Sequence, residues 1–255
     1  MIRLFKANFR KEYIELKRYL PNTVSLFVTV YCIFLAIFLG LKFVGDPATF
    51  DDNVQYSIIS MIFWTISVVA MSYAGGTISQ EAMRGTLEQL YMSPSAMWKI
   101  MLSRLCAQLS LQSIVVLILL FAAMLTTGQW LNLNPLTTIP VIVLTLISMI
   151  GVGFMIAGIA LIYKQIDQIL QILQFVLMGL TFIPLSVAPF LVYAPFVKGV
   201  DMIRTIMMRN YTLADIPVSD FVILVANAII YLVIGLYVYL YCEKKAMQNG
   251  LLGQY

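Results

Sequence analysis

Six long apolar stretches constrain the fold of this chain more than any other feature of its sequence. They cover approximately residues 23–44, 54–74, 105–126, 138–163, 168–185 and 221–241. A transmembrane helix needs about 20 apolar residues to cross the hydrocarbon core of a bilayer. Only 11% of the 255 residues are charged, whereas a soluble domain has roughly 25%. The sequence therefore predicts an all-α membrane protein with six transmembrane helices.

Residues 1–20 predict an amphipathic helix that lies flat in the membrane interface. Their six bases are spread along the segment, unlike the short basic start of a signal peptide. Apolar residues recur at every third or fourth position, namely Ile2, Phe5, Phe9, Tyr13, Leu16 and Leu20. This spacing gathers them on one face of a helix and leaves the bases to meet lipid head groups. The alternative is a solvated helix packed on a partner. We expect Pro21-Asn22-Thr23 to end the helix.

The distribution of bases predicts that both termini lie in the cytoplasm. With the N-terminus inside, the inner segments hold Arg3, Lys6, Arg10, Lys11, Lys17, Arg18, Arg84, Lys99, Arg104, Lys164, Lys244 and Lys245. The outer segments then hold only Lys42, Lys198, Arg204 and Arg209. Because cytoplasmic loops carry an excess of Lys and Arg, the opposite orientation is rejected.

The spans lack the groups that other classes of membrane protein require. None of the predicted spans carries Asp, Glu, Lys or Arg near its middle, where an ion-coupled carrier usually needs one. The chain has no histidine and no G-x-x-x-x-G-K-[ST] phosphate-binding loop. The close acidic group Asp46, Asp51 and Asp52 is interpreted as a solvated outer loop. We therefore expect no catalytic residue, metal or cofactor in this chain, and any ATP must bind to another chain.

Residues 78–104 form the longest predicted inner break and contain an organised short helix. Thr86 and Gln89 have the spacing of a capping box, and Gly85 before them allows a sharp entry. The apolar residues that follow share one helical face, and they are Leu87, Leu90 and Tyr91. Ser93-Pro94 suits the N-cap and first residue of the next helix. An ordinary connecting loop is the simpler interpretation, but the pattern favours a rigid helix that docks on a soluble partner.

This stretch resembles the permease subunits of the ABC-2 family of ATP-binding-cassette transporters. That family typically carries an acidic residue, a basic residue, Gly-Thr-Leu-Glu-x-Leu and Ser-Pro between its second and third spans. The residues that match are Glu81, Arg84, Gly85, Thr86, Leu87, Glu88, Gln89, Leu90, Ser93 and Pro94. The resemblance covers residues 1–255 as a single transmembrane domain, with an interfacial helix at 1–20 and an outer segment at 186–219.

The resemblance implies a half-transporter that exports an amphipathic substrate such as a drug, antibiotic, peptide or lipid. Two permeases, either two copies or this chain and a sister subunit, would pair within the membrane lipids. Cytoplasmic ABC ATPase subunits would bind ATP and Mg, and residues 81–94 would form the coupling helix that transmits their motion. The implied location is the plasma membrane of a bacterial or archaeal cell, with no nucleic acid as partner.

Glutamines within the spans are the candidates for a substrate path. Four of them start the fifth span at intervals of three, namely Gln165, Gln168, Gln171 and Gln174, and two lie one turn apart in the third span, Gln108 and Gln112. Amides at this depth need partners, so they either make hydrogen bonds between helices or face the substrate. The small residues of the fourth span predict close helix packing, and they are Gly151, Gly153, Ala157 and Gly158.

The outer segment 186–219 is too polar for a seventh span, but its apolar residues recur at helical spacing. We expect short helices that dip into the outer leaflet. Three charged side chains are expected to face water, and they are Lys198, Asp201 and Arg204.

Two alternative functions stay open, a self-contained secondary transporter and a membrane lipid-modifying enzyme. A neighbouring reading frame that encodes an ATPase would favour the exporter over both.

Overall fold

The computed structural model describes residues 2–163 and 165–250, and the regular structure of these residues is helical. Lys164, one of the bases that the topology prediction assigns to the inner segments, lies outside the described residues. The elements in chain order are α1 (Ile2–Arg18), α2 (Leu20–Val44), η1 (Pro47–Thr49), α3 (Phe50–Met83), α4 (Leu87–Tyr91), α5 (Met97–Thr127), α6 (Pro135–Tyr163), α7 (Asp167–Phe182), η2 (Pro189–Tyr193), α8 (Val197–Arg209) and α9 (Val218–Gln248).

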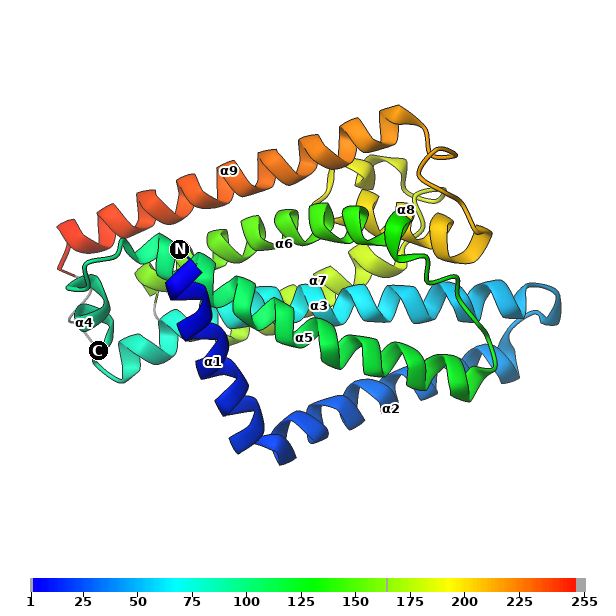
Figure 1. Cartoon of the computed structure of the whole chain (residues 1–255), viewed down its shortest axis with the longest axis horizontal. Helices are drawn as coiled ribbons and strands as arrows, with labels where there is room; N and C mark the ends of the chain where they lie inside the picture. The colour runs from blue at the N-terminus through cyan, green and yellow to red at the C-terminus, as the bar shows by residue number, and fades with distance from the viewer. Residues whose placement is uncertain (1, 164, 251–255) are drawn as a thin grey trace.

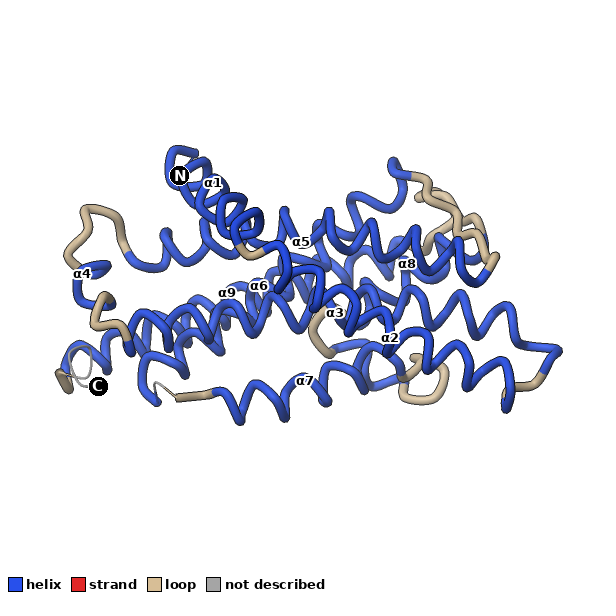
Figure 2. Tube along the Cα trace, turned by 90° about the horizontal axis from the view of Figure 1, so that it is seen from below, coloured by secondary structure: helices blue, strands red, loops and turns tan. Residues whose placement is uncertain are grey.

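The long helices run along one axis and form a bundle with two distinct ends (Figure 1). One end carries α4, the start of α1 and the last turns of α9, and the other carries α8 and the turn between α2 and α3. Turned by a right angle, the bundle shows α1 and α7 on opposite faces (Figure 2). The start of the first described helix and the last turns of the final one therefore lie at the same end.

Five helical segments are long and apolar enough to cross a membrane, namely Leu20–Val44, Pro47–Met83, Met97–Thr127, Pro135–Tyr163 and Val218–Gln248. The expected fifth crossing corresponds to α7, which is apolar but has only 16 residues. At 1.5 Å per residue it spans about 24 Å, which is less than the ~30 Å hydrocarbon core. It stops at Phe182 because the residue before Pro184 is pushed out of the helical conformation. The chain is thus a multi-pass membrane protein, and its described residues contain five candidate crossings and the short apolar helix α7.

The prediction that the second span gives way to a polar loop after Ala74 is wrong. Helix α3 continues to Met83, because Ile78 and Ala82 prolong its buried face at intervals of four residues. Helix α5 likewise begins at Met97, eight residues before the expected start, because Met97 and Met101 already pack into the core. Charged and polar residues on the outer side of these extensions obscure the apolar period.

The break after the first helix also lies elsewhere than expected. Helix α1 ends at Arg18 and α2 starts at Leu20, so Pro21 belongs to the first turn of α2. Proline is tolerated there because the amide at that position has no helical partner to lose. All six bases of α1 are exposed, whereas Phe5 and Phe9 are partly buried.

Helices α6 and α9 pack so closely that side chains are excluded from the contact. Gly151 faces the backbone of Tyr231, and Gly235 faces the backbone of Gly151. A Cβ added to Gly158 would lie 3.0 Å from the Cα of Tyr239. Small residues let helices approach in a membrane, where dispersion replaces the hydrophobic effect as the packing force. The predicted close packing of the fourth span is confirmed.

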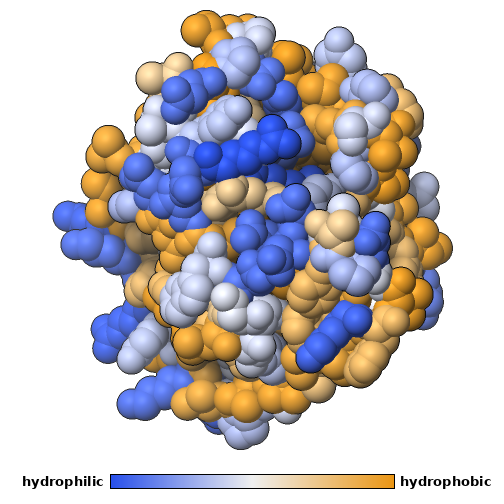
Figure 3. Space-filling view, turned by 90° about the vertical axis from the view of Figure 1, so that its right-hand side faces the viewer, coloured by the Kyte–Doolittle hydropathy of each residue, from blue (hydrophilic) through white to orange (hydrophobic). Residues whose placement is uncertain are grey.

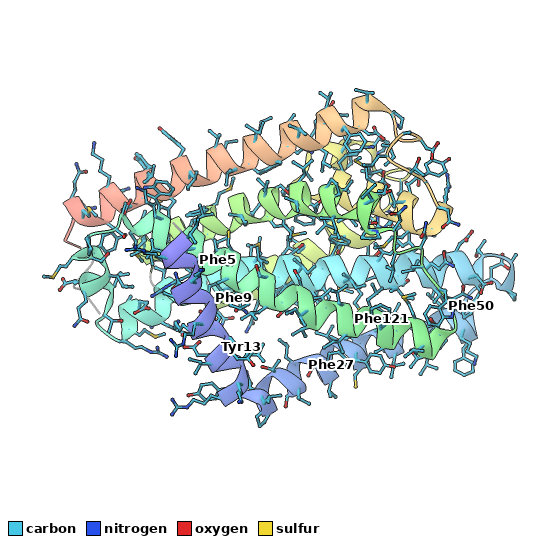
Figure 4. All side chains as sticks on the ribbon, viewed as in Figure 1. Phe5, Phe9, Tyr13, Phe27, Phe50 and Phe121 are labelled. Atoms are coloured by element: carbon cyan, nitrogen blue, oxygen red, sulfur yellow. The ribbon has the colours of Figure 1, made fainter. Side chains whose placement is uncertain are left out.

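Helix α2 is the most exposed of the long helices and is held by an aromatic stripe. Phe27, Tyr31, Phe34 and Phe38 follow one another at spacings of three or four residues, with ring centroids 6.1–6.4 Å apart. The stripe ends on Phe50 at the start of α3. Phe27 and Phe50 mark its two ends in Figure 4. Only Val30 and Phe34 of α2 are buried, so the remainder of its surface is left for lipid or another chain.

The end of the bundle that carries α8 gathers polar side chains across its face, with apolar residues between and around them (Figure 3). Asp46, Asp51 and Asp52 are exposed, as expected of a solvated loop. Gln129 donates to the Asp51 carboxylate over 2.6 Å and accepts from Gln55 over 3.2 Å, which joins two turns. The outer segment contains the predicted short helices, η2 and α8.

The contact between α6 and α9 predicts a position-specific effect of adding one methyl group. Gly235→Ala places a Cβ against the backbone of Gly151, and forcing such helices apart costs about 1–3 kcal/mol. The thermal unfolding midpoint of the purified protein should fall. Gly40→Ala is the matched control, because a Cβ there meets nothing within 4 Å. Equal midpoints for the two variants would contradict this packing.

Candidate functional site

The connection between α3 and α5, residues 84–96, forms a compact tip at the end of the bundle where α1 starts and α9 ends (Figure 1). Helix α3 ends at Met83, a turn of three residues follows, and α4 occupies Leu87–Tyr91. Gly85 has a φ of 68°, which confirms the sharp entry expected from the sequence. Other residues are strained in this left-handed conformation, so glycine suits the turn. The tip is therefore a defined structure and not a loose loop.

A network around Glu81 fastens the base of the tip. The Glu81 carboxylate pairs with Arg104 Nη1 of α5 over 3.0 Å and accepts a hydrogen bond from the hydroxyl of Thr86. Arg104 is buried, so this pair is shielded from water. The network ties the end of α3, the start of α4 and the first turns of α5 together.

Two sequence predictions about the tip are wrong in detail. Thr86 is the N-cap of α4, but its hydroxyl turns back to Glu81 and makes no capping bond to Gln89. Glu81 lies near because α3 continues into the turn, and its charged carboxylate is a strong acceptor for the hydroxyl of Thr86. Helix α5 is capped by Ala96 and not by Ser93, whose hydroxyl donates to the Ser95 carbonyl.

The tip has one face packed on its own chain. Leu87 is 1% exposed, and Leu90 and Tyr91 pack partly buried against the same core. Burial raises the pKa of the Tyr91 hydroxyl well above its ordinary value. The three apolar residues predicted to share a face therefore do so, and they dock the tip on the bundle.

The other face of the tip is open to solvent. Arg84, Glu88, Gln89 and Pro94 are exposed, and Met92 is 84% exposed. A pocket of about 330 Å³ lies beside it, between the start of α5 and the end of α9. The charge of Glu81 is paired with Arg104 within the chain.

The structure separates the two groups of glutamines. Gln108 and Gln112 line a common pocket between α1, α2, α3 and α5. Gln168 and Gln171 are exposed on α7, on the opposite face of the bundle, and Gln174 is partly buried. The backbone carbonyl of Gln174 accepts a hydrogen bond from Trp64 Nε1 over 3.1 Å.

Sequence reasoning missed a buried arginine at the opposite end of the bundle. Arg204 of α8 is 5% exposed, so the expectation that it faces water is wrong. Its guanidinium lies 3.9 Å from the ring centroid of Tyr56 and donates to Ser60 Oγ over 2.8 Å and to the Thr181 carbonyl. Burial lowers the pKa of Arg204 against the opposing influence of Tyr56 and Asp201. Its partners belong to α3 and α7, so no local pattern could reveal it.

Lys198 is also buried rather than directed toward water. It pairs with Asp201 over 3.8 Å, as the spacing of three suggests, and more closely with Asp220 of α9 over 3.0 Å. Burial raises the pKa of Asp201, and the Lys198 ammonium opposes that rise. The described residues hold no group of three or more His, Cys, Asp or Glu that could bind a metal ion.

The network at the base of the tip predicts non-additive substitutions. Removing Glu81 or Arg104 alone leaves the other charge unpaired, at a cost of about 1.5–3 kcal/mol for a charged hydrogen bond. Glu81→Ala and Arg104→Ala should each lower the thermal midpoint, and the double variant should lower it by less than their sum. Lys99→Ala, on the exposed side of α5, is the control. Strict additivity would show that the pair contributes nothing.

Comparison with known proteins identifies one family. A model described as ABC-2 type transporter matches residues 3–208, which include α1 to α7, the tip and nearly all of α8. A search of curated proteins gives no match. Domains of this family transport substrates and are not catalytic, and they normally work with an ATPase partner. The match covers most of the chain, and the chain belongs to the ABC-2 type transporter family.

Proposed function

We propose that this chain is the permease subunit of an ATP-driven exporter and that the exposed face of the tip binds the ATPase. The observation that carries the proposal is a rigid tip with a free face at one end of a membrane bundle. Its inner face is fixed by Leu87 and by the Glu81–Arg104 pair, while Arg84 and Glu88 remain exposed. ATP and Mg would bind to the partner, and ATP-driven motion would enter through this contact.

The chemistry of the free face suits a soluble partner. Arg84 and Glu88 offer charges of both signs, and Met92 offers a flexible apolar side chain. Methionine adapts to irregular surfaces, which is useful at a contact that moves. The neighbouring pocket, lined by Trp98 and Met247 among others, gives a partner side chain a place to insert.

The exposed bases support a cytoplasmic location for the tip and both termini. All six bases of α1 and Lys99 beside the tip are exposed, and α1 starts at this end of the bundle. They would meet the anionic inner leaflet of the plasma membrane while α1 lies along its interface. In this orientation α7 and the η2 segment together complete a sixth crossing. A bacterial or archaeal membrane fits the resemblance noted above.

The outward face of α7 supports pairing with a second permease, either another copy or a sister subunit. Ile172 and Phe175 are strongly exposed there. Gln168 and Gln171 interrupt this apolar face, and an amide that faces lipid lacks a hydrogen-bonding partner. A partner permease or an aqueous path between two permeases would supply one. Substrate would then move along this face by alternating access.

The buried charge at Arg204 does not favour an ion-coupled carrier. A coupling group must bind and release an ion during each cycle, and arginine keeps its proton at any physiological pH. Arg204 is also held by Tyr56, Ser60 and the Thr181 carbonyl. Its geometry fits a structural anchor that fixes α8 to α3 and α7.

The proposal predicts that substitutions on the tip weaken binding of the ATPase that co-purifies from the native membrane. Arg84→Ala or Glu88→Ala removes a charge from a contact that becomes buried, which typically costs about 2–5 kcal/mol, or roughly 30-fold or more in affinity. The permease should still insert and fold, because neither side chain holds the tip together. Titration of the purified ATPase onto the reconstituted permease measures the effect.

Lys42→Ala is the control for this titration, because Lys42 is exposed near the opposite end of the bundle. The proposal fails if the tip variants bind the ATPase as tightly as the Lys42 variant, or if no nucleotide-binding chain co-purifies.

The orientation predicts which introduced cysteines react with an impermeant thiol reagent in intact cells. Cysteines at Asn53 and Ala214 should react, because both positions are exposed at the α8 end. Cysteines at Gln89 and Gln248 should react only after the membrane is opened. Labelling of the cysteine at position 89 in intact cells would contradict the proposed orientation. The background requires replacement of the three native cysteines, Cys32, Cys106 and Cys242.

A further inference from the structure

A pocket of about 370 Å³ lies between the elbow of α1 and α2 on one side and helices α3 and α5 on the other. It is separate from the tip and from the exposed face of α7. Gln108 and Gln112 reach it from α5, Ser72 and Thr77 from α3, and Asn22 from α2. The pocket thus brings together polar side chains from three helices of the bundle.

The charge of the pocket is opposite to that of the helix that covers it. Helix α1 has six bases and two acids, and both acids, Glu12 and Glu15, line the pocket. No Lys or Arg is among the described lining residues. Glu12 is buried and accepts a hydrogen bond from the Tyr73 hydroxyl over 2.6 Å. Lys11, which does not line the pocket, approaches Glu12 and Glu15 within 3.4 and 3.6 Å from the solvent side.

Two polar groups at the pocket lack a partner among the described residues. Gln112 is 7% exposed and lines the pocket, yet its amide makes no hydrogen bond there. The hydroxyl of Ser72 is buried and has no hydrogen-bond partner. Buried polar groups are nearly always paired, because an unpaired one costs its full desolvation. The Gln112 amide, which lines the pocket, therefore points to a polar ligand that completes it.

An apolar groove of about 490 Å³ adjoins the pocket and shares Leu16, Thr23 and Leu111 with it. Phe9 and Tyr13 of α1 and Phe27 of α2 line this groove, and all three are marked in Figure 4. Its lining is apolar, and three of the lining residues, Val24, Ile114 and Ile118, are exposed on the surface of the bundle. A polar pocket beside an apolar groove matches the two halves of an amphiphile.

We propose that this pocket binds the primary ammonium group of an amphiphile drawn from the membrane leaflet next to α1, with its chain in the adjoining groove. A primary ammonium group donates three hydrogen bonds and accepts none. Glu12, Glu15 and the Gln112 carbonyl oxygen are the acceptors, and the two carboxylates repel an anionic head group. The proposal rests on the exporter function above, for which this pocket would be the place where substrate enters.

The test is a binding measurement on the purified full-length chain in nanodiscs of phosphatidylglycerol. The probe is a dodecyl chain with a dansyl group at one end and a free primary amine at the other. The matched probe carries a hydroxyl in place of the amine. The amine probe should bind about tenfold more tightly, as expected of a charge-assisted hydrogen bond. Equal affinity for the two probes would overturn the proposal.

Substitutions in the pocket test whether the amine probe binds there. Gln112→Leu and Glu12→Gln should each weaken binding of the amine probe by about tenfold and leave the hydroxyl probe unaffected. Gln248→Leu is the matched control, because the same change is made at an exposed position at the end of α9, a helix that contributes no residue to the pocket. If Glu12→Gln lowers the thermal midpoint, Gln112→Leu decides the outcome. An amine affinity that is the same in Gln112→Leu and Gln248→Leu contradicts the site.

The source of the amine is distinguished by changing the lipid. Nanodiscs that contain phosphatidylethanolamine should compete with the probe if the head group of that lipid is the natural occupant. Undiminished binding in those nanodiscs assigns the pocket to a soluble cationic amphiphile. Neither measurement uses the ATPase. Failure here therefore leaves the role of the tip standing, and failure of the tip variants leaves the amine site standing.

Discussion

Lipid hydrocarbon cannot form hydrogen bonds, and this constraint determines where every other feature of the protein lies. Each crossing must satisfy its own backbone, so the crossings are helices. Charges follow the same rule. The Glu81–Arg104 pair fixes one end, and Arg204 and Lys198 fix the other. Between them the helices are held by close contacts such as Gly151 with Gly235.

This arrangement brings the tip and the start of α1 together at one end of the bundle. The tip is tied to α3 and α5 through Glu81, so a force on its free face is transmitted to two crossings at once. Helix α1 is tied to the same pair of helices by Asn8 with Ser103 and Glu12 with Tyr73. A movement of the tip would therefore reach the amine pocket, which the same helices enclose.

The apolar period of the sequence predicted which segments are helical, because burial in lipid or in the core leaves a local record. It predicted helix ends poorly. At Ala74 the polarity rises, yet Ile78 and Ala82 keep one face buried and α3 continues. The sharp turn at Gly85 was predictable, since a positive φ strongly favours glycine. The turn of Thr86 toward Glu81 and the burial of Arg204 were not, because their partners are set by how separate helices pack.

If the free face of the tip binds an ATPase, photocrosslinking in the native membrane will capture that contact. A benzophenone side chain placed at the exposed position 89 should react with a neighbour within a few ångströms on irradiation. We expect an adduct with a separate chain that also binds an azido analogue of ATP. The same probe at position 53, at the opposite end, should give no such adduct. Crosslinks from position 89 only to lipid or to this chain itself would show that no ATPase contacts the tip.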